Sequence, residues 1–85
     1  MPELSRFMGM VIHMYYDDHS DPHFHVREAD NICRIDLNGN LLDGNISLPK
    51  LHIVKRWTAL HHDELLNNWK SIRNGKQPER IKPWQ

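Results

Sequence analysis

The sequence predicts an α+β domain: a four-stranded antiparallel β-meander with one face covered by one bent or two C-terminal helices. Three observations lead to this class. Apolar and polar residues alternate through much of residues 10–37, which is the period of half-buried strands. The triplet Asn38-Gly39-Asn40 is a hairpin signal, because Asn and Gly accept the positive φ of tight turns. Across residues 51–72 the apolar side chains recur at helical spacing.

The alternating pattern divides the first half of the chain into four strands. They are expected at residues 7–16, 23–28, 32–37 and 41–46. Gly9 falls inside the first of them and predicts a bulge or a close approach of backbone. Alternate residues of the strands then face the helices and build one core with them. The predicted core members are Ile12, Met14, Phe24, Val26, Ile35, Val54, Leu65 and Trp69.

A helical segment is expected over residues 47–75. Ser47 suits the position that caps a helix, and Pro49 is tolerated in the first turn, where its missing N–H costs nothing. The apolar stripe does not run evenly through the whole segment, which predicts a bend or break near residues 61–63. Asp63 is the expected cap of a second helix beyond that break.

We expect a single domain over residues 1–85, with the meander at 1–46, the helical segment at 47–75 and an extended tail at 76–85. Ile81 and Trp84 are the residues expected to tether the tail. Hydrophobic residues make up 39% and charged residues 26% of the chain, which is typical of a globular protein and too apolar for disorder. The single cysteine, the lack of a membrane-spanning apolar run and the lack of a secretion signal favour the cytoplasm. No motif indicates a particular cofactor.

The formal net charge is zero, but the two halves of the chain differ in sign. Residues 1–46 carry eight acidic and three basic side chains, and residues 47–85 carry eight basic and three acidic ones. The molecule as a whole therefore has no long-range field to attract a polyanion. Its basic half either forms an ordinary solvated helix face or offers a local patch to an acidic partner or a phosphate backbone.

Four histidines crowd residues 13–25, and two of them, His23 and His25, are two positions apart on one predicted strand. Side chains two apart on a strand project from the same face. If Phe24 faces the core, the hairpin register places His13 opposite His25 and Tyr15 opposite His23. One polar sheet face then carries His13, Tyr15, His23, His25, Arg27, Arg34 and Asp36.

Three kinds of surface fit this polar face. A metal site needs three or four converging ligands, and its candidates are His23, His25, His19 and Asp18. A metal-independent site that cleaves phosphodiesters needs a general acid, a general base and a cation, and its candidates are His13, His23, His25 and Arg34. The third possibility is a solvent-facing polar surface, which either carries no site or binds a partner through Tyr15, Arg27 and Asp36.

The chain also resembles a known family. The resemblance rests on residues 2–7, Met14-Tyr15-Tyr16 with Asp18-His19, Pro22-His23-Phe24-His25, Trp57, Leu60-His61, Glu64-Leu65 and Asn68-Trp69. These residues are similar to those of the small prokaryotic family catalogued as domain of unknown function 4160. Asp21 stands where a second proline is expected. No activity is established for the family, so the resemblance assigns no catalytic residue.

The resemblance further implies a genetic setting, because members of the family often sit beside another small uncharacterised protein, an arrangement that suggests a toxin–antitoxin-like pair. We therefore expect a cytoplasmic component of a two-gene module that binds a nearby-encoded protein through the histidine-bearing face, with RNA as a further candidate partner. A metal-binding domain centred on His23 and His25 and a metal-independent ribonuclease-like enzyme stay open as alternatives. Trp84 could also anchor a second copy of the chain, so a homo-oligomer stays open too.

Overall fold

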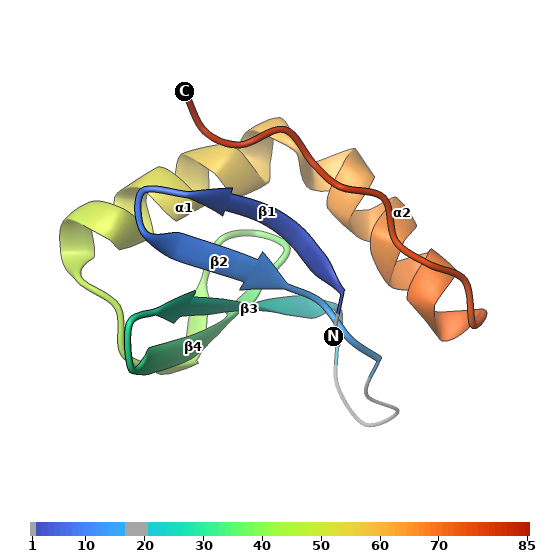
Figure 1. Cartoon of the computed structure of the whole chain (residues 1–85), viewed down its shortest axis with the longest axis horizontal. Helices are drawn as coiled ribbons and strands as arrows, with labels where there is room; N and C mark the ends of the chain where they lie inside the picture. Colours follow the sequence, from blue (N-terminus) through green and yellow to red (C-terminus); the bar gives the residue numbers. More distant parts are fainter. Residues whose placement is uncertain (1, 17–20) are drawn as a thin grey trace.

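A computed structural model describes residues 2–16 and 21–85, which form one antiparallel sheet and two helices (Figure 1). The elements in chain order are β1 (Glu3–Phe7), β2 (Met10–His13), β3 (His23–Glu28), β4 (Asn31–Asp36), β5 (Leu41–Gly44), α1 (Leu48–Leu60) and α2 (His62–Arg73). The strands neighbour one another in the order β1-β2-β3-β4-β5. The predicted α+β meander with C-terminal helices is confirmed, with five strands in place of four.

The additional strand comes from a turn at Met8-Gly9. Both residues have positive φ, 51° and 76°, and Phe7 pairs with Met10 across them. A two-residue loop with two positive φ angles matches the twist of a hairpin. The prediction of one strand over residues 7–16 was therefore wrong, and Gly9 belongs to a turn rather than a bulge. The sequence did not indicate this turn, because methionine rarely adopts positive φ and Met8 is therefore not a turn signal.

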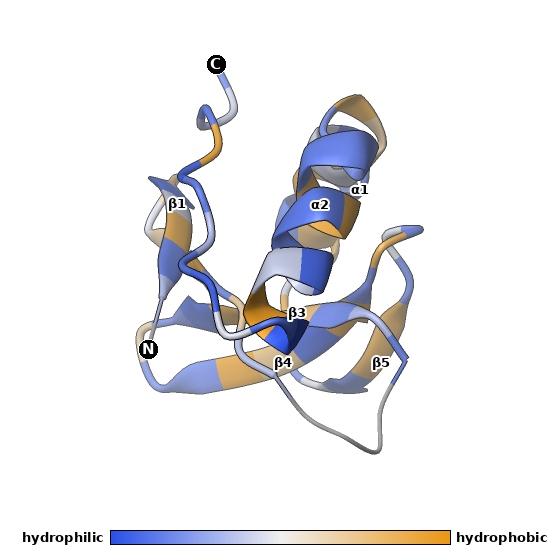
Figure 2. Cartoon of the chain, turned by 90° about the vertical axis from the view of Figure 1, so that its right-hand side faces the viewer, coloured by the Kyte–Doolittle hydropathy of each residue, from blue (hydrophilic) through white to orange (hydrophobic). Residues whose placement is uncertain are grey.

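Both helices pack on the same face of the sheet (Figures 1 and 2). All eight predicted core residues are at most 3% exposed and belong to one hydrophobic cluster. The predicted pairing of His13 with His25 is confirmed, and on the other side of β3 Phe24 lies opposite Ile35. No helix or strand of the described residues covers the opposite face of the sheet (Figure 2).

The predicted break in the helical segment is confirmed. His61 separates α1 from α2 with φ −115° and ψ 24°, outside helical values. The predicted cap by Asp63 was wrong, because Asp63 lies within the first turn of α2 and its side chain is fully exposed. Its negative charge is still favourable at the positive end of the helix dipole. Among the described residues, no helix is both long and apolar enough to cross a membrane.

The C-terminal tail is held by specific contacts. Ile81 is 3% exposed and donates its backbone N–H to the carbonyl oxygen of Leu4 at 2.7 Å. Asn68 of α2 clamps Glu79, because its Nδ2 donates to the Glu79 carbonyl oxygen at 2.8 Å and its Oδ1 accepts from the Glu79 N–H at 2.9 Å. Trp84 packs against the core cluster. The predicted tether by Ile81 and Trp84 is confirmed.

Candidate functional site

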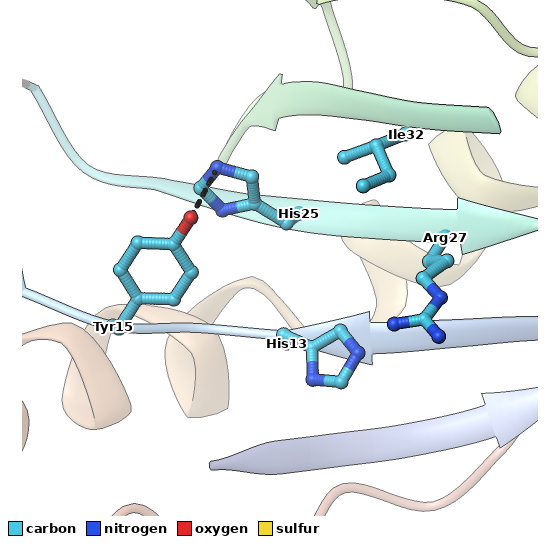
Figure 3. A pocket seen from close by; sticks show the side chains of 5 residues that line it. All are labelled: His13, Tyr15, His25, Arg27 and Ile32. Carbon is cyan, nitrogen blue, oxygen red and sulfur yellow. Dashed lines mark hydrogen bonds between the residues drawn. The ribbon is translucent and has the colours of Figure 1, made fainter. Parts of the chain in front are cut away.

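The uncovered face of the sheet contains a pocket between β2, β3 and β4 (Figure 3). The strand register creates it, because β2 and β3 place His13 beside His25, and Arg27 follows two residues later on the same face. The pocket has a volume of about 310 Å³, including its open mouth. Its lining residues are His13, Tyr15, His25, Arg27 and Ile32.

Tyr15 and His25 form an aromatic pair at one end of this pocket. Their rings are stacked, with centroids 4.5 Å apart and planes 14° apart. The Tyr15 hydroxyl lies 3.0 Å from Nε2 of His25, which is a hydrogen bond (Figure 3). The predicted pairing of Tyr15 with His23 was wrong. Strand β2 ends at His13, so the next residues leave the ladder and Tyr15 leans across to His25.

Burial lowers the pKa of both His13 and His25 below the ordinary value of 6.5, which favours the neutral imidazole at pH 7. At His13 the Glu3 carboxylate opposes this shift and the positive charge of Arg27 adds to it. The geometry gives the reason. Nδ1 of each ring is buried and has no hydrogen-bond partner among the described residues. Protonating either ring would create a buried N–H without an acceptor, and such an unsatisfied donor costs about 1–3 kcal/mol.

The same two Nδ1 atoms decide which nitrogen carries the proton in the neutral rings. A proton on Nδ1 would again be an unsatisfied donor, so the favoured tautomer has its proton on Nε2. The Nε2–H of His25 then donates to the Tyr15 oxygen, which leaves the Tyr15 O–H free to donate to a ligand. The Nε2–H of His13 remains available on the side where Arg27 lies (Figure 3).

Arg27 supplies the positive charge of the pocket. Its side chain is exposed, and it forms no salt bridge with any described residue. The described residues that line the pocket include no carboxylate. The pocket thus combines N–H and O–H donors with one cation that pairs with no described carboxylate, and an oxyanion such as phosphate binds to groups of this kind.

His23 occupies a different environment from the predicted polar surface. It is only 2% exposed, and its ring contacts Trp69 of α2 at 5.4 Å and His25 at 5.2 Å between centroids. Its Nδ1 donates to the carbonyl oxygen of Asp21 at 2.9 Å, since a carbonyl can only accept. The expectation that His23 projects openly beside His25 was therefore wrong. Near this end of the sheet, Trp69 reaches the imidazole and covers it.

Arg34 and Asp36 are engaged with their own neighbours. Arg34 donates from Nε and Nη2 to Asp43 of β5 at 2.8 and 2.6 Å. Asp36 accepts the backbone N–H groups of Asn38 and Asn40, each at 2.9 Å, and so holds the β4–β5 turn. Burial raises the pKa of Asp36, but these hydrogen bonds outweigh it and lower the pKa overall. Both residues line a second hollow with His23, apart from the His13 pocket.

The candidate metal ligands are only partly within the described structure. His19 and Asp18 lie outside the described residues. Within residues 2–16 and 21–85, no group of three or more His, Cys, Asp or Glu side chains is arranged to hold a metal ion. His23 and His25 are adjacent, but Nδ1 of His23 is bonded to Asp21 and Nε2 of His25 to Tyr15.

Two features of the site were missed by sequence reasoning. Ile32 forms an apolar wall of the pocket and is 55% exposed. The sequence did contain a usable signal, because Ile32 is two residues from Arg34 on the same strand and so shares its face, whereas Cys33 lies on the opposite face. The contact between Trp69 and His23 had no signal in the sequence, since the two residues are 46 positions apart and meet only through packing.

Comparison with known proteins adds one finding. The family model described as domain of unknown function (DUF4160) matches residues 9–70. The chain belongs to this family. The matched DUF4160 region contains every residue that lines the His13 pocket, along with α1 and most of α2. Neither the curated proteins nor the solved structures give a significant match to the chain.

Proposed function

We propose that this protein binds RNA through the uncovered sheet face and holds a backbone phosphate in the pocket formed by His13, Tyr15, His25, Arg27 and Ile32. One observation carries the proposal: the described lining residues offer several hydrogen-bond donors and one unpaired guanidinium, without a carboxylate. Phosphate oxygens accept such bonds, and arginine matches their geometry. A metal cation would instead need converging lone pairs, which these tautomers do not offer.

The aromatic pair beside the donors favours RNA over a free anion. Tyr15 is 37% exposed, and its ring lies parallel to His25 on the open sheet. Proteins that recognise single-stranded RNA commonly stack its bases on aromatic side chains, in several cases on an open sheet face. A phosphate bound at Arg27 would leave a neighbouring base within reach of Tyr15, and Ile32 adds apolar contact surface.

The arrangement of the histidines supports RNA binding better than RNA cleavage. A general base must present an accessible lone pair to its substrate. For His13, a lone pair on Nε2 requires the proton on the buried, unpartnered Nδ1, at a cost of about 1–3 kcal/mol. His23 has its proton on Nδ1, as a base would need, but it is 2% exposed and lines a different hollow. We therefore assign His13 and His25 to binding.

The family setting suggests the biological context. We infer that the protein is one component of a toxin–antitoxin-like two-gene module, and that the neighbouring gene product binds the same sheet face. Ile32 and Leu42 are 55% and 48% exposed near the two hollows of this face. Exposed apolar residues mixed with Tyr and Arg are typical of the central part of protein interfaces. A partner bound there would exclude RNA.

The Arg27→Gln variant tests the phosphate contact. Fluorescence anisotropy with a fluorescein-labelled single-stranded RNA of about eight nucleotides gives the affinity over a range of salt concentrations. We expect Arg27→Gln to weaken binding about tenfold or more, because a charge-assisted contact is lost. The slope of log affinity against log salt should become shallower by about 0.7. Arg56→Gln, which removes the same charge from the exposed side of α1, is the matched control.

The outcome separates the pocket from general charge. Equal loss in Arg27→Gln and Arg56→Gln would mean that RNA follows net charge and not the pocket. No binding by the wild type would refute the proposal. Tyr15 supplies a second pair of variants, since Tyr15→Phe removes only the hydroxyl and Tyr15→Leu removes the ring as well. We expect a partial loss of affinity in the first and a larger loss in the second.

Coexpression with the neighbouring gene tests the module. We expect the partner protein to co-purify with the wild type and to compete with RNA for the sheet face. The His13→Gln/His25→Gln variant should lose partner and RNA together if both use this face. Undiminished partner recovery by that variant would place the protein interface elsewhere, and an unchanged growth rate on expression of the wild type alone would argue against a toxin role.

A further inference from the structure

A third hollow, of about 490 Å³ including its open mouth, lies at the C-terminal end of α2. Its described lining residues are Tyr16, Lys70, Arg73 and Asn74. Lys70 and Arg73 are exposed, and neither forms a salt bridge with a described residue. Several other cations of the chain, such as Arg6, Lys50 and Arg80, are paired with carboxylates. The hollow thus brings together two positive charges that pair with no carboxylate of residues 2–16 and 21–85.

Helix geometry places these groups together. Lys70 and Arg73 are three residues apart on α2, so their side chains are neighbours on the helix surface, and Asn74 follows directly as the C-cap. The negative end of the helix dipole tolerates cations in the last turn. The dipole does not explain why Tyr16, from another segment, lines the same hollow. A bound anion would account for the grouping, because it could accept hydrogen bonds from the Lys70 ammonium, the Arg73 guanidinium and the Asn74 amide.

The hollow is connected to the His13 pocket by aromatic rings. Tyr16 contacts Trp69 with centroids 6.3 Å apart, Trp69 contacts His23 at 5.4 Å, and His23 contacts His25 at 5.2 Å. His25 in turn stacks on Tyr15 at 4.5 Å. Tyr15 and Tyr16 are consecutive residues, and each lines one of the two sites. The two donor sets therefore lie on either side of one short segment at the end of the sheet.

We propose that the hollow of Tyr16, Lys70, Arg73 and Asn74 is a second phosphate-binding subsite, which takes a further phosphate of the same RNA strand. This inference rests on the RNA binding proposed above for the His13 pocket. A strand long enough to reach both sites gains two electrostatic contacts beyond the first pocket. A dinucleotide, with one phosphodiester, fills the His13 pocket alone.

The test compares three variants with the wild type, by anisotropy with the same RNA of about eight nucleotides and by an NMR titration with an unlabelled dinucleotide. In Lys70→Gln/Arg73→Gln we expect affinity for the longer RNA to fall about tenfold or more, and its salt slope to become shallower by about 0.7, for one lost phosphate contact. Binding of the dinucleotide should not change. The matched control is Arg56→Gln/Lys82→Gln, which removes two exposed charges elsewhere. Arg27→Gln reports on the His13 pocket.

Each outcome distinguishes the subsite from the function on which it rests. Unchanged binding of the longer RNA by Lys70→Gln/Arg73→Gln, together with weakened binding by Arg27→Gln, overturns the subsite and leaves the His13 pocket standing. An equal loss in the control double variant also overturns it, because charge alone would then account for binding. If only Lys70→Gln/Arg73→Gln loses affinity, the subsite stands and the His13 pocket does not. A wild type that binds neither RNA overturns both.

Discussion

Phe24 separates the two faces of the sheet, and its truncation tests the register on which the site depends. It lies between His23 and His25 on β3, opposite Ile35, and is completely buried. Its ring meets Trp57 edge to face, with centroids 5.9 Å apart and planes at 77°. Because successive strand residues alternate in direction, Phe24 in the core requires His25 on the uncovered face.

The cost of Phe24→Ala follows from this burial. Removing a core phenylalanine forfeits its transfer free energy and leaves a cavity, which together cost about 3–5 kcal/mol. For a domain of 85 residues, stability of about 0.05–0.15 kcal/mol per residue gives a total of roughly 4–13 kcal/mol. The substitution should therefore remove a large share of the stability. Phe24→Leu keeps most of the buried volume and should cost about 1–2 kcal/mol.

Urea denaturation provides the measurement. Trp57 and Trp69 are 0% and 3% exposed, so their fluorescence should change when the core opens. The difference in free energy of unfolding between wild type and Phe24→Ala is then obtained at constant slope. A loss below about 1 kcal/mol would mean that Phe24 faces solvent. In that case His25 would face the helices, and the proposed pocket could not form.

Three further predictions concern protonation, the tail and metals. The lowered pKa values of His13 and His25 mean that the unfolded chain binds more protons than the folded one below pH 6.5. The free energy of unfolding should therefore be highest above that pH and fall as the pH drops. Urea denaturation at several pH values should show this dependence, which should be weaker in His13→Gln/His25→Gln. Asn68→Ala leaves two backbone groups of the tail unpaired and should lower the free energy of unfolding by about 2–4 kcal/mol in the same assay; a change under about 0.5 kcal/mol would show that the clamp is absent in solution. Zinc or nickel should leave the melting temperature unchanged, and a rise of several degrees that His23→Gln abolishes would revive the metal alternative.

The sequence alone determined the class of fold and the direction of most side chains. Alternation with a period of two leaves little freedom in the register of the strands, since a slip of one residue would expose Phe24, Val26 and Ile35 together. The facing of His13 with His25 followed from that constraint. The helical segment, its break and the tail tether could also be predicted, because helical spacing and the effects of Gly and Pro on the backbone depend on residues close together in the sequence. The turn at Met8-Gly9 escaped notice because its first residue carries no turn signal.

The roles of the polar residues depend on contacts that form only when distant elements pack together. Trp69 arrives from α2 and buries His23, while the end of β2 lets Tyr15 reach His25. Arg34 meets its carboxylate only because β5 pairs with β4, which leaves Arg27 as the cation of the pocket. The protonation of the histidines also depends on the tertiary structure, because a histidine's pKa changes when its ring nitrogens are buried away from water. Local sequence fixes the face on which a side chain lies, whereas its partners and its charge depend on elements that are distant along the chain.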